Sequence, residues 1–236
     1  MLEHVSSYKY LGLTFNFNGK FNVGIKQLKE QGRRAMMSLL QKSRLLQLPL
    51  STQLELFNYL VRAILTYSCE VWGYNCIEII ESLQLEYLKY ILHVKKSTPN
   101  IFVYGETGQF PLSVHIHCRM VKFWRRLCND TEGKFSSRML GTLLKCHKYN
   151  IYDSEWLLKI KQILDDTGLS FVWHTPRAVS YNWLDANLSR RLKDAFIQGW
   201  AQKCNDSNKT SNYPMYKTTF EFEKYLDNLP DGTELS

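Results

Sequence analysis

The stretch YKYLGLTF at residues 8–15 decides how the fold of this chain is interpreted. Aromatic and β-branched side chains dominate it, which is typical of a β-strand. The following NFNG at 16–19 contains Asn-Gly, a strong hairpin-turn signal, and residues 20–23 offer a short returning strand. A two-stranded hairpin is only marginally stable alone in water. We therefore expect this hairpin either to pack on other elements of the chain or to belong to a larger sheet.

The composition is that of a globular protein, with 44% hydrophobic and 14% aromatic side chains among 236 residues. No apolar run has the length of a membrane span, and no basic start is followed by an apolar run. The six cysteines have no paired spacing, which favours reduced thiols. We expect an intracellular protein without a membrane partner, and the residues do not distinguish nucleus from cytoplasm.

Most of the chain after the hairpin has the three-and-four apolar spacing of helices. The first helix is predicted over about 22–46, where Gly32 lies on the apolar face and would allow another helix to come close. The TQLE sequence at 52–55 is a capping box that predicts the start of the second helix. The segment 97–111, with two prolines and two glycines, is predicted to be a loop. Further helices are expected around 77–91, 116–127, 136–148, 154–166, 183–204 and 219–228.

The fold class that follows is mainly α: a helical bundle with a short N-terminal β-hairpin and further helices toward the C-terminus. The net charge of +8 is concentrated in two blocks of this helical chain. Seven basic residues and one acid lie in 20–44, and eight basic residues and two acids lie in 119–148. Such blocks favour a polyanionic partner, because neutralising phosphates releases counterions. On charge alone, a solvated lysine-rich surface remains the alternative.

Both blocks place cations at helical spacing. In the first helix the basic stripe is Lys26, Lys29 and Arg33. In the helix around 116–127 it is Arg119, Lys122 and Arg126, flanked by Arg125. We predict that these seven residues contact nucleic-acid phosphates without reading sequence. Trp124 next to the second stripe is an aromatic candidate for stacking on bases, but it adjoins the apolar face, so we expect it to be buried.

Catalytic and metal-binding patterns are weak. The pair Asp165 and Asp166 has the composition of a two-metal site, but its spacing to nearby apolar residues predicts a solvated helix end. The histidines and cysteines lack the short paired spacing of a structural zinc site. No Gly-x-Ser-x-Gly motif and no phosphate-binding loop occurs. We expect no catalytic residue, no metal, no cofactor and no small-molecule substrate. The zinc candidates considered are His115, His117, Cys118, Cys128, Cys146 and His147.

Several short motifs resemble one family when taken in order. KYLG at 9–12 resembles the Tyr-Leu-Gly strand that follows the catalytic palm in non-LTR (LINE-type) retrotransposon reverse transcriptases. ILTYSCEVWG at 64–73 is similar to the ILTYGCEVWG segment of those proteins, with serine for the first glycine. STPN at 97–100, VYGETG at 103–108, FWRRL at 123–127 and FEFEKYL at 220–226 resemble later blocks of the same family. The resemblance covers nearly the whole chain.

The resemblance implies a palm-edge β-hairpin at 5–21, a thumb-like helical domain at 22–130, a helical connector at 131–205 and a polar, acidic segment at 206–236. It implies contact with a template–primer duplex. The metal-binding palm aspartates of this family, which would hold Mg²⁺ in the parent polymerase, precede the Tyr-Leu-Gly strand. No catalytic residue is therefore carried over to this chain, and no polymerase activity is expected of it alone.

Three hypotheses stay open at this point. The chain is a reverse-transcriptase fragment, a nucleic-acid-binding module retained by a host, or a pseudogene product without a selected role. The resemblance also implies that the hairpin meets the palm. We accordingly expect Tyr8, Tyr10 and Leu13 to be partly exposed.

Overall fold

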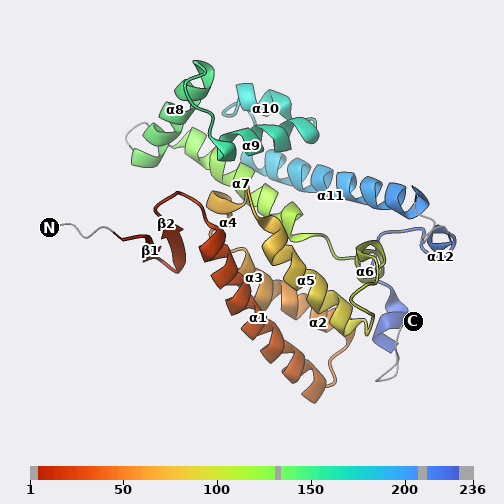
Figure 1. Cartoon of the computed structure of the whole chain (residues 1–236). Coiled ribbons are helices and arrows are strands. Elements are labelled where there is room, and N and C mark those ends of the chain that lie inside the picture. The colour runs from red at the N-terminus through yellow and green to blue at the C-terminus, as the bar shows by residue number, and fades with distance from the viewer. Residues whose placement is uncertain (1–4, 131–133, 207–211, 229–236) are drawn as a thin grey trace. The chain divides into compact units, whose positions relative to one another are not determined.

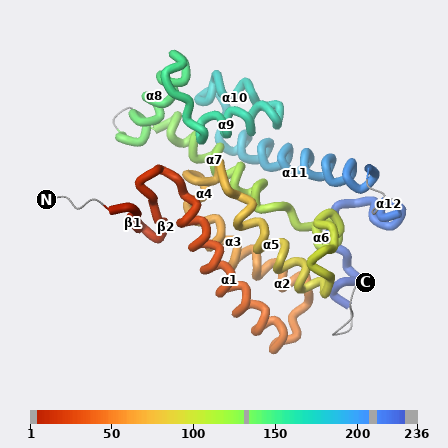
Figure 2. Tube along the Cα trace, viewed as in Figure 1, coloured from red at the N-terminus to blue at the C-terminus, as the bar shows by residue number. Residues whose placement is uncertain are grey.

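The computed structural model describes residues 5–130, 134–206 and 212–228 and is mainly α-helical, with one antiparallel hairpin at its N-terminal end (Figures 1 and 2). The predicted fold class is confirmed. The elements are β1 (Ser7–Tyr10), β2 (Leu13–Asn16), α1 (Asn22–Leu45), α2 (Leu50–Leu56), the π-helix η1 (Phe57–Val61), α3 (Arg62–Leu65), α4 (Cys69–Trp72), α5 (Ile77–Ile91), α6 (Asn100–Thr107), α7 (Leu112–Asn129), α8 (Phe135–Lys148), α9 (Glu155–Asp166), α10 (Ser170–His174), α11 (Tyr181–Asp206), α12 (Tyr213–Tyr216) and the 3₁₀ helix η2 (Lys224–Asn228).

The hairpin turns earlier than the sequence predicted. β1 and β2 pair from Ser7 with Asn16 to Tyr10 with Leu13, so the expected single strand over 8–15 folds back on itself and the expected partner strand at 20–23 is wrong. Leu11 and Gly12 form the two-residue turn with φ values of 46° and 89°. A type I′ turn needs positive φ at both central residues, and glycine supplies it without steric cost at the second.

The NFNG sequence still forms a turn, but it leads into α1. The Gly19 amide donates to the carbonyl oxygen of Asn16 (3.0 Å), and the Lys20 amide donates to Asn18 Oδ1 (3.0 Å). The prediction of a turn at this position is therefore confirmed, but the turn joins β2 to α1 and not two strands.

β2 is covered by α1, whereas every residue of β1 is exposed. Tyr8 and Tyr10 are 62% and 57% exposed, as predicted, whereas the prediction for Leu13 is wrong because Leu13 is only 3% exposed. A Cβ at Gly24 of α1 would lie 3.1 Å from Leu13 Cδ1 and 2.8 Å from the Thr14 carbonyl oxygen. The missing side chain at Gly24 lets β2 lie directly on the first turn of α1.

The chain divides into two compact units, and each is described by itself. Unit 1 consists of Met1–Tyr67, Cys76–Leu112 and Gly199–Ser236, and unit 2 consists of Ser68–Asn75 and Ser113–Gln198. This division falls elsewhere than the expected boundary between 130 and 131. The expected connector and the expected acidic segment lie in part outside the described residues, at 131–133, 207–211 and 229–236.

The core of unit 1 forms where α1 packs against α3 and α5 (Figures 1 and 2). Gly32 of α1 lets α3 come close, because a Cβ there would lie 2.4 Å from Leu65 Cδ2. The expected close helix contact at Gly32 is confirmed. Phe57 stacks on Tyr87 at a centroid distance of 4.3 Å, and the Tyr87 hydroxyl donates to the Gln53 carbonyl oxygen (2.8 Å).

Two predictions within unit 1 are wrong. α2 begins at Leu50 after Pro49, without a side-chain cap, so the predicted capping box at 52–55 does not start the helix. The predicted loop at 97–111 contains α6, which begins after Pro99 and ends at Gly108 in the left-handed conformation (φ 59°). Proline before the first turn and glycine after the last are ordinary helix boundaries.

The segment after α11 in unit 1 is hydrogen-bonded to α6. Both oxygens of the Glu106 carboxylate accept tyrosine hydroxyls, Oε1 from Tyr213 (2.7 Å) and Oε2 from Tyr225. The Glu223 amide donates to the Glu106 carbonyl oxygen (3.0 Å). The VYGETG and FEFEKYL motifs are thus partners in space. This pairing also holds residues 222–223 extended, so the predicted helix over 219–228 is reduced to η2.

The core of unit 2 is built on α7. Trp124 is 1% exposed, as predicted, and stacks on Trp173 at a centroid distance of 5.4 Å. A Cβ at Gly73 would lie 2.2 Å from Ile116 Cγ2, so Gly73 lets the segment after α4 lie against α7. Asp165 and Asp166 lie exposed at the C-terminal end of α9, as predicted.

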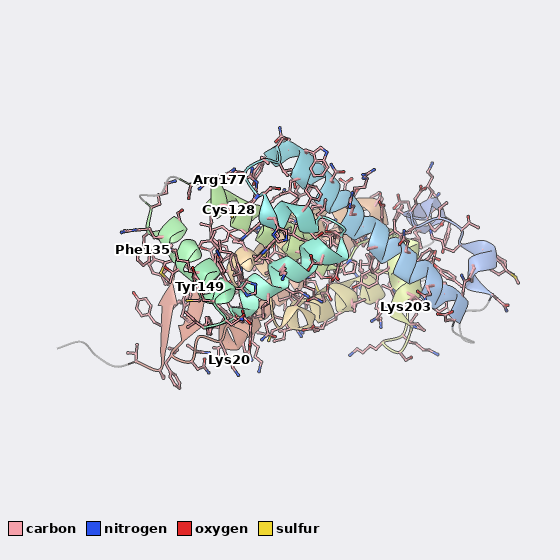
Figure 3. The ribbon with its side chains drawn as sticks, turned by 90° about the horizontal axis from the view of Figure 1, so that it is seen from above. Lys20, Cys128, Phe135, Tyr149, Arg177 and Lys203 are labelled. Carbon is pink, nitrogen blue, oxygen red and sulfur yellow. The ribbon has the colours of Figure 1, made fainter. Side chains whose placement is uncertain are left out.

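α8 exposes most of its surface within unit 2. Leu140 is its one buried residue among those that the structure describes, and Phe135 and Tyr149 near its two ends are exposed (Figure 3). In the described part of the chain, no helix combines the length and the apolar character needed to cross a membrane.

Candidate nucleic-acid interface

The stripe on α1 belongs to unit 1 and is tied to α5. Lys26 is exposed, whereas Lys29 Nζ donates to Ser82 Oγ (2.8 Å). Arg33 Nη1 lies 2.5 Å from Glu86 Oε1, and this hydrogen bond raises the pKa of Arg33 above its usual value. Two of the three cations therefore already have partners on the neighbouring helix.

The stripe on α7 belongs to unit 2 and is also paired, but it surrounds open space. Arg119 Nη2 donates to Glu70 Oε2 (2.7 Å), and Lys122 Nζ lies 2.5 Å from Asp185 Oδ1. Arg126 is exposed, and its guanidinium carbon lies 5.0 Å above the centroid of the Phe123 ring, a cation–π distance.

These side chains surround an open pocket of about 160 Å³. Three cations, two aromatic rings and one carboxylate line it, so its charge is positive overall. The lining residues are Glu70, Arg119, Lys122, Phe123, Arg126 and Tyr181. A surface with this composition can hold phosphate oxygens by charge-assisted hydrogen bonds and a base or sugar by stacking.

Local structure fixes the positions of the lining residues. The three cations recur every three or four residues on α7, which puts them on one face. Glu70 lies in the one-turn helix α4, and the Trp156 indole Nε1 donates to its carbonyl oxygen (2.7 Å). Tyr181 is the first residue of α11 and is 46% exposed, and Ser180 caps that helix by accepting the Trp183 amide (3.2 Å).

Arg125 is not on this surface. It is 3% exposed, and its Nη2 donates to the Val179 carbonyl oxygen (2.7 Å). Within the described residues, its Nε and Nη1 are buried without a hydrogen-bond partner. The expectation that Arg125 contacts phosphate is therefore not retained. Arg125 instead points into unit 2 toward the Val179 carbonyl oxygen, while the neighbouring Arg126 is exposed, because adjacent residues of a helix face different directions.

The other groups considered for chemistry are buried or scattered. Burial raises the pKa of the Cys69 thiol to about 12 and that of Cys128 to about 11, so both stay protonated at neutral pH. Burial lowers the pKa of His117 to about 4, which keeps it neutral. Among the residues that the structure describes, no three His, Cys, Asp or Glu side chains gather as metal ligands would.

Arg177 and Cys128 lie close together in unit 2, where Arg177 Nε donates to the Cys128 carbonyl oxygen (2.9 Å; Figure 3). This contact joins α7 to the segment before α11 and has a structural role.

Sequence reasoning found the three cations of the pocket but missed Glu70, Asp185 and Tyr181. Glu70 belongs to the ILTYSCEVWG motif, and its position in that motif was the one signal that pointed to it. Asp185 and Tyr181 lie more than fifty residues after the stripe, and no local pattern connects them to it.

Comparisons with protein-family models, with curated proteins and with solved structures found no match.

Proposed function

We propose that this chain corresponds to the region that follows the palm in a non-LTR retrotransposon reverse transcriptase, and that it binds template–primer nucleic acid through its basic helices. The observation that carries the proposal is the α7 pocket, where Arg119, Lys122 and Arg126 stand beside two aromatic rings. Phosphate contacts made by such cations give affinity without sequence preference.

The contribution of α1 is weaker in this proposal. Lys26 is the exposed cation of the α1 stripe, while Lys29 and Arg33 contact α5. Exposed ion pairs are worth little, so a phosphate can replace Glu86 as the partner of Arg33. The stripe on α1 then adds to the affinity without determining it.

The exposed apolar side chains of the hairpin support the same assignment. The hairpin exposes four large apolar side chains, and a cluster of this kind is typical of a surface that contacts another element. These residues are Tyr8, Tyr10, Leu11 and Phe17. The resemblance locates this hairpin at the edge of the palm, where that surface would be covered.

We propose no polymerase activity for the chain alone. Asp165 and Asp166 point to solvent from the end of α9, without the hairpin setting in which polymerase aspartates face the phosphates. Primer extension with the purified chain, a template–primer duplex and Mg²⁺ should yield no product. Magnesium-dependent extension would overturn this part of the proposal.

Binding itself is tested by fluorescence anisotropy of a labelled template–primer duplex. The variant Arg119→Glu/Lys122→Glu/Arg126→Glu should lose binding that the parent chain shows. The matched control is Arg138→Glu/Lys145→Glu/Lys148→Glu on α8, which makes the same charge change in the same unit. Circular dichroism melts establish that both variants are folded.

Three outcomes are informative. Loss of binding in the α7 variant alone supports the proposal. Equal loss in both variants means that net charge, and not this pocket, attracts the duplex. Full binding by the α7 variant means that the stripe is only solvated, which would refute the proposal.

A further inference from the structure

We infer that the α7 pocket binds a terminal phosphomonoester of a nucleic-acid strand in preference to the internal phosphodiesters of its backbone. The inference rests on the proposed function and assigns a ligand to the same site. It starts from the arrangement of Arg119, Lys122 and Arg126, which line one open pocket of about 160 Å³.

Three cations line the pocket, and Glu70 and Asp185 already pair with two of them, so an incoming anion has to attract these cations away. A phosphomonoester carries about 1.5 to 2 negative charges at neutral pH and offers three strong acceptor oxygens. An internal phosphodiester carries one charge and has fewer free oxygens. Arg119, Lys122 and Arg126 supply donors from one helix face, so the group with more charge and more acceptors gains more from them.

The existing ion pairs sharpen this preference. Arg119 Nη2 lies 2.7 Å from Glu70 Oε2, and Lys122 Nζ lies 2.5 Å from Asp185 Oδ1. An incoming anion therefore competes with two carboxylates for these cations. A single negative charge competes poorly for both cations at once. A dianion is better suited to draw both away from their present partners, because its attraction to each cation is larger.

The aromatic rings and the start of α11 favour the end of a strand. Phe123 is covered on one face by Arg126, while Tyr181 is exposed at the rim. A terminal nucleotide has one neighbour in its strand and can turn its base onto Tyr181, whereas an internal nucleotide is stacked on both sides. Tyr181 is also the first residue of a 26-residue helix, so the positive end of that helix dipole lies at the rim of the pocket.

The test compares single-stranded oligonucleotides of one sequence that carry a 5′-phosphate, a 3′-phosphate or no terminal phosphate. Binding to the full chain is measured by competition against a labelled oligonucleotide at fixed salt. We expect at least one phosphorylated form to bind about tenfold more tightly than the unphosphorylated form. Adenosine 5′-monophosphate should compete at higher concentration, and adenosine should not.

Variants connect the preference to the pocket. Lys122→Gln/Arg126→Gln should remove the preference, and the matched control Arg138→Gln/Lys145→Gln on α8 should keep it. Arg119 is left intact because its pair with Glu70 joins α4 to α7. Thermal melts of both variants check that the fold is retained.

Each result decides the question. A preference that is lost only in the pocket variant supports the inference. Salt-dependent binding that is equal for all three oligonucleotides overturns the inference and leaves the proposed function standing. A preference that survives in the pocket variant overturns it as well. If no oligonucleotide and no duplex binds, both the inference and the proposed function are wrong.

Discussion

The stripes on α1 and α7 have the same spacing but different surroundings. Each places three cations at positions i, i+3 and i+7 of a helix, Lys26, Lys29 and Arg33 on α1 and Arg119, Lys122 and Arg126 on α7. On α1 the second and third cations contact α5, a helix that packs along α1. On α7 the cations surround a pocket with Phe123 and Tyr181. The neighbouring element, and not the spacing, decides whether a basic stripe becomes a candidate binding site.

The largest expected difference is between charge reversals of the two stripes. Reversing all three α7 cations should weaken duplex binding by about 100-fold or more, because two lost charge-assisted hydrogen bonds of about 1.5 kcal/mol already have that effect. Reversing Lys26, Lys29 and Arg33 should weaken it less than tenfold. Anisotropy titrations of both variants at one salt concentration measure the two losses. Equal losses would break the distinction between the stripes.

The aromatic rim of the pocket gives the next largest effect. Tyr181→Ala should weaken binding of a single-stranded end by roughly tenfold, since stacking on one base contributes about 1 to 3 kcal/mol. Binding of a blunt duplex, whose bases are paired, should change little. The control is Tyr149→Ala, an exposed tyrosine next to α8 that does not line the pocket. A loss of the same size with this control would count against a role for Tyr181.

Removing the carboxylate of Glu70 should strengthen binding. In Glu70→Gln the negative charge at the pocket disappears, while the bond from Trp156 to the residue 70 carbonyl oxygen is kept. We expect roughly threefold to tenfold tighter binding at low salt and a smaller gain at high salt, since screening reduces the charge effect. Isothermal titration with the duplex at two salt concentrations measures it. Weaker binding would mean that Glu70 positions Arg119 for the ligand.

The corresponding change on α1 should have the smallest effect. Glu86→Gln removes the partner of Arg33, but both side chains are more than a third exposed, so the pair contributes about 0 to 1 kcal/mol to stability. Binding should change less than twofold, and the free energy of unfolding should change less than about 1 kcal/mol. Denaturant melts and anisotropy test both numbers. A gain as large as that of Glu70→Gln would make the two stripes equivalent.

The sequence predicted the helices better than their boundaries and turns. In 97–111 the prolines and glycines indicated a loop, yet Pro99 precedes α6 and Gly108 ends it. Gly105 lies inside α6 at a point where a larger residue would not fit, because a Cβ there would lie 2.6 Å from the Tyr213 hydroxyl. That contact comes from more than a hundred residues away, so the local pattern could not indicate it.

The sequence predicted the cations of the candidate site but not the carboxylates that pair with them. Helical spacing alone puts Arg119, Lys122 and Arg126 on one face of α7. Whether a cation of the stripe stays accessible depends on tertiary neighbours such as Asp185, which lies on another helix. Arg125 shows the same limit, because it is buried and donates to the carbonyl oxygen of Val179, a residue 54 positions away in the sequence.

The salt dependence of duplex binding tests the central claim most directly. The dissociation constant is measured for the parent chain and for Arg119→Gln/Lys122→Gln/Arg126→Gln between low and physiological salt. Each phosphate contact contributes about 0.9 to the slope of log affinity against log salt concentration. The account predicts that the variant's slope is shallower than that of the parent chain by about 1 if the three cations share one phosphate and by up to about 3 if each contacts its own. A slope that is the same in both proteins would contradict the claim that these three residues contact phosphates.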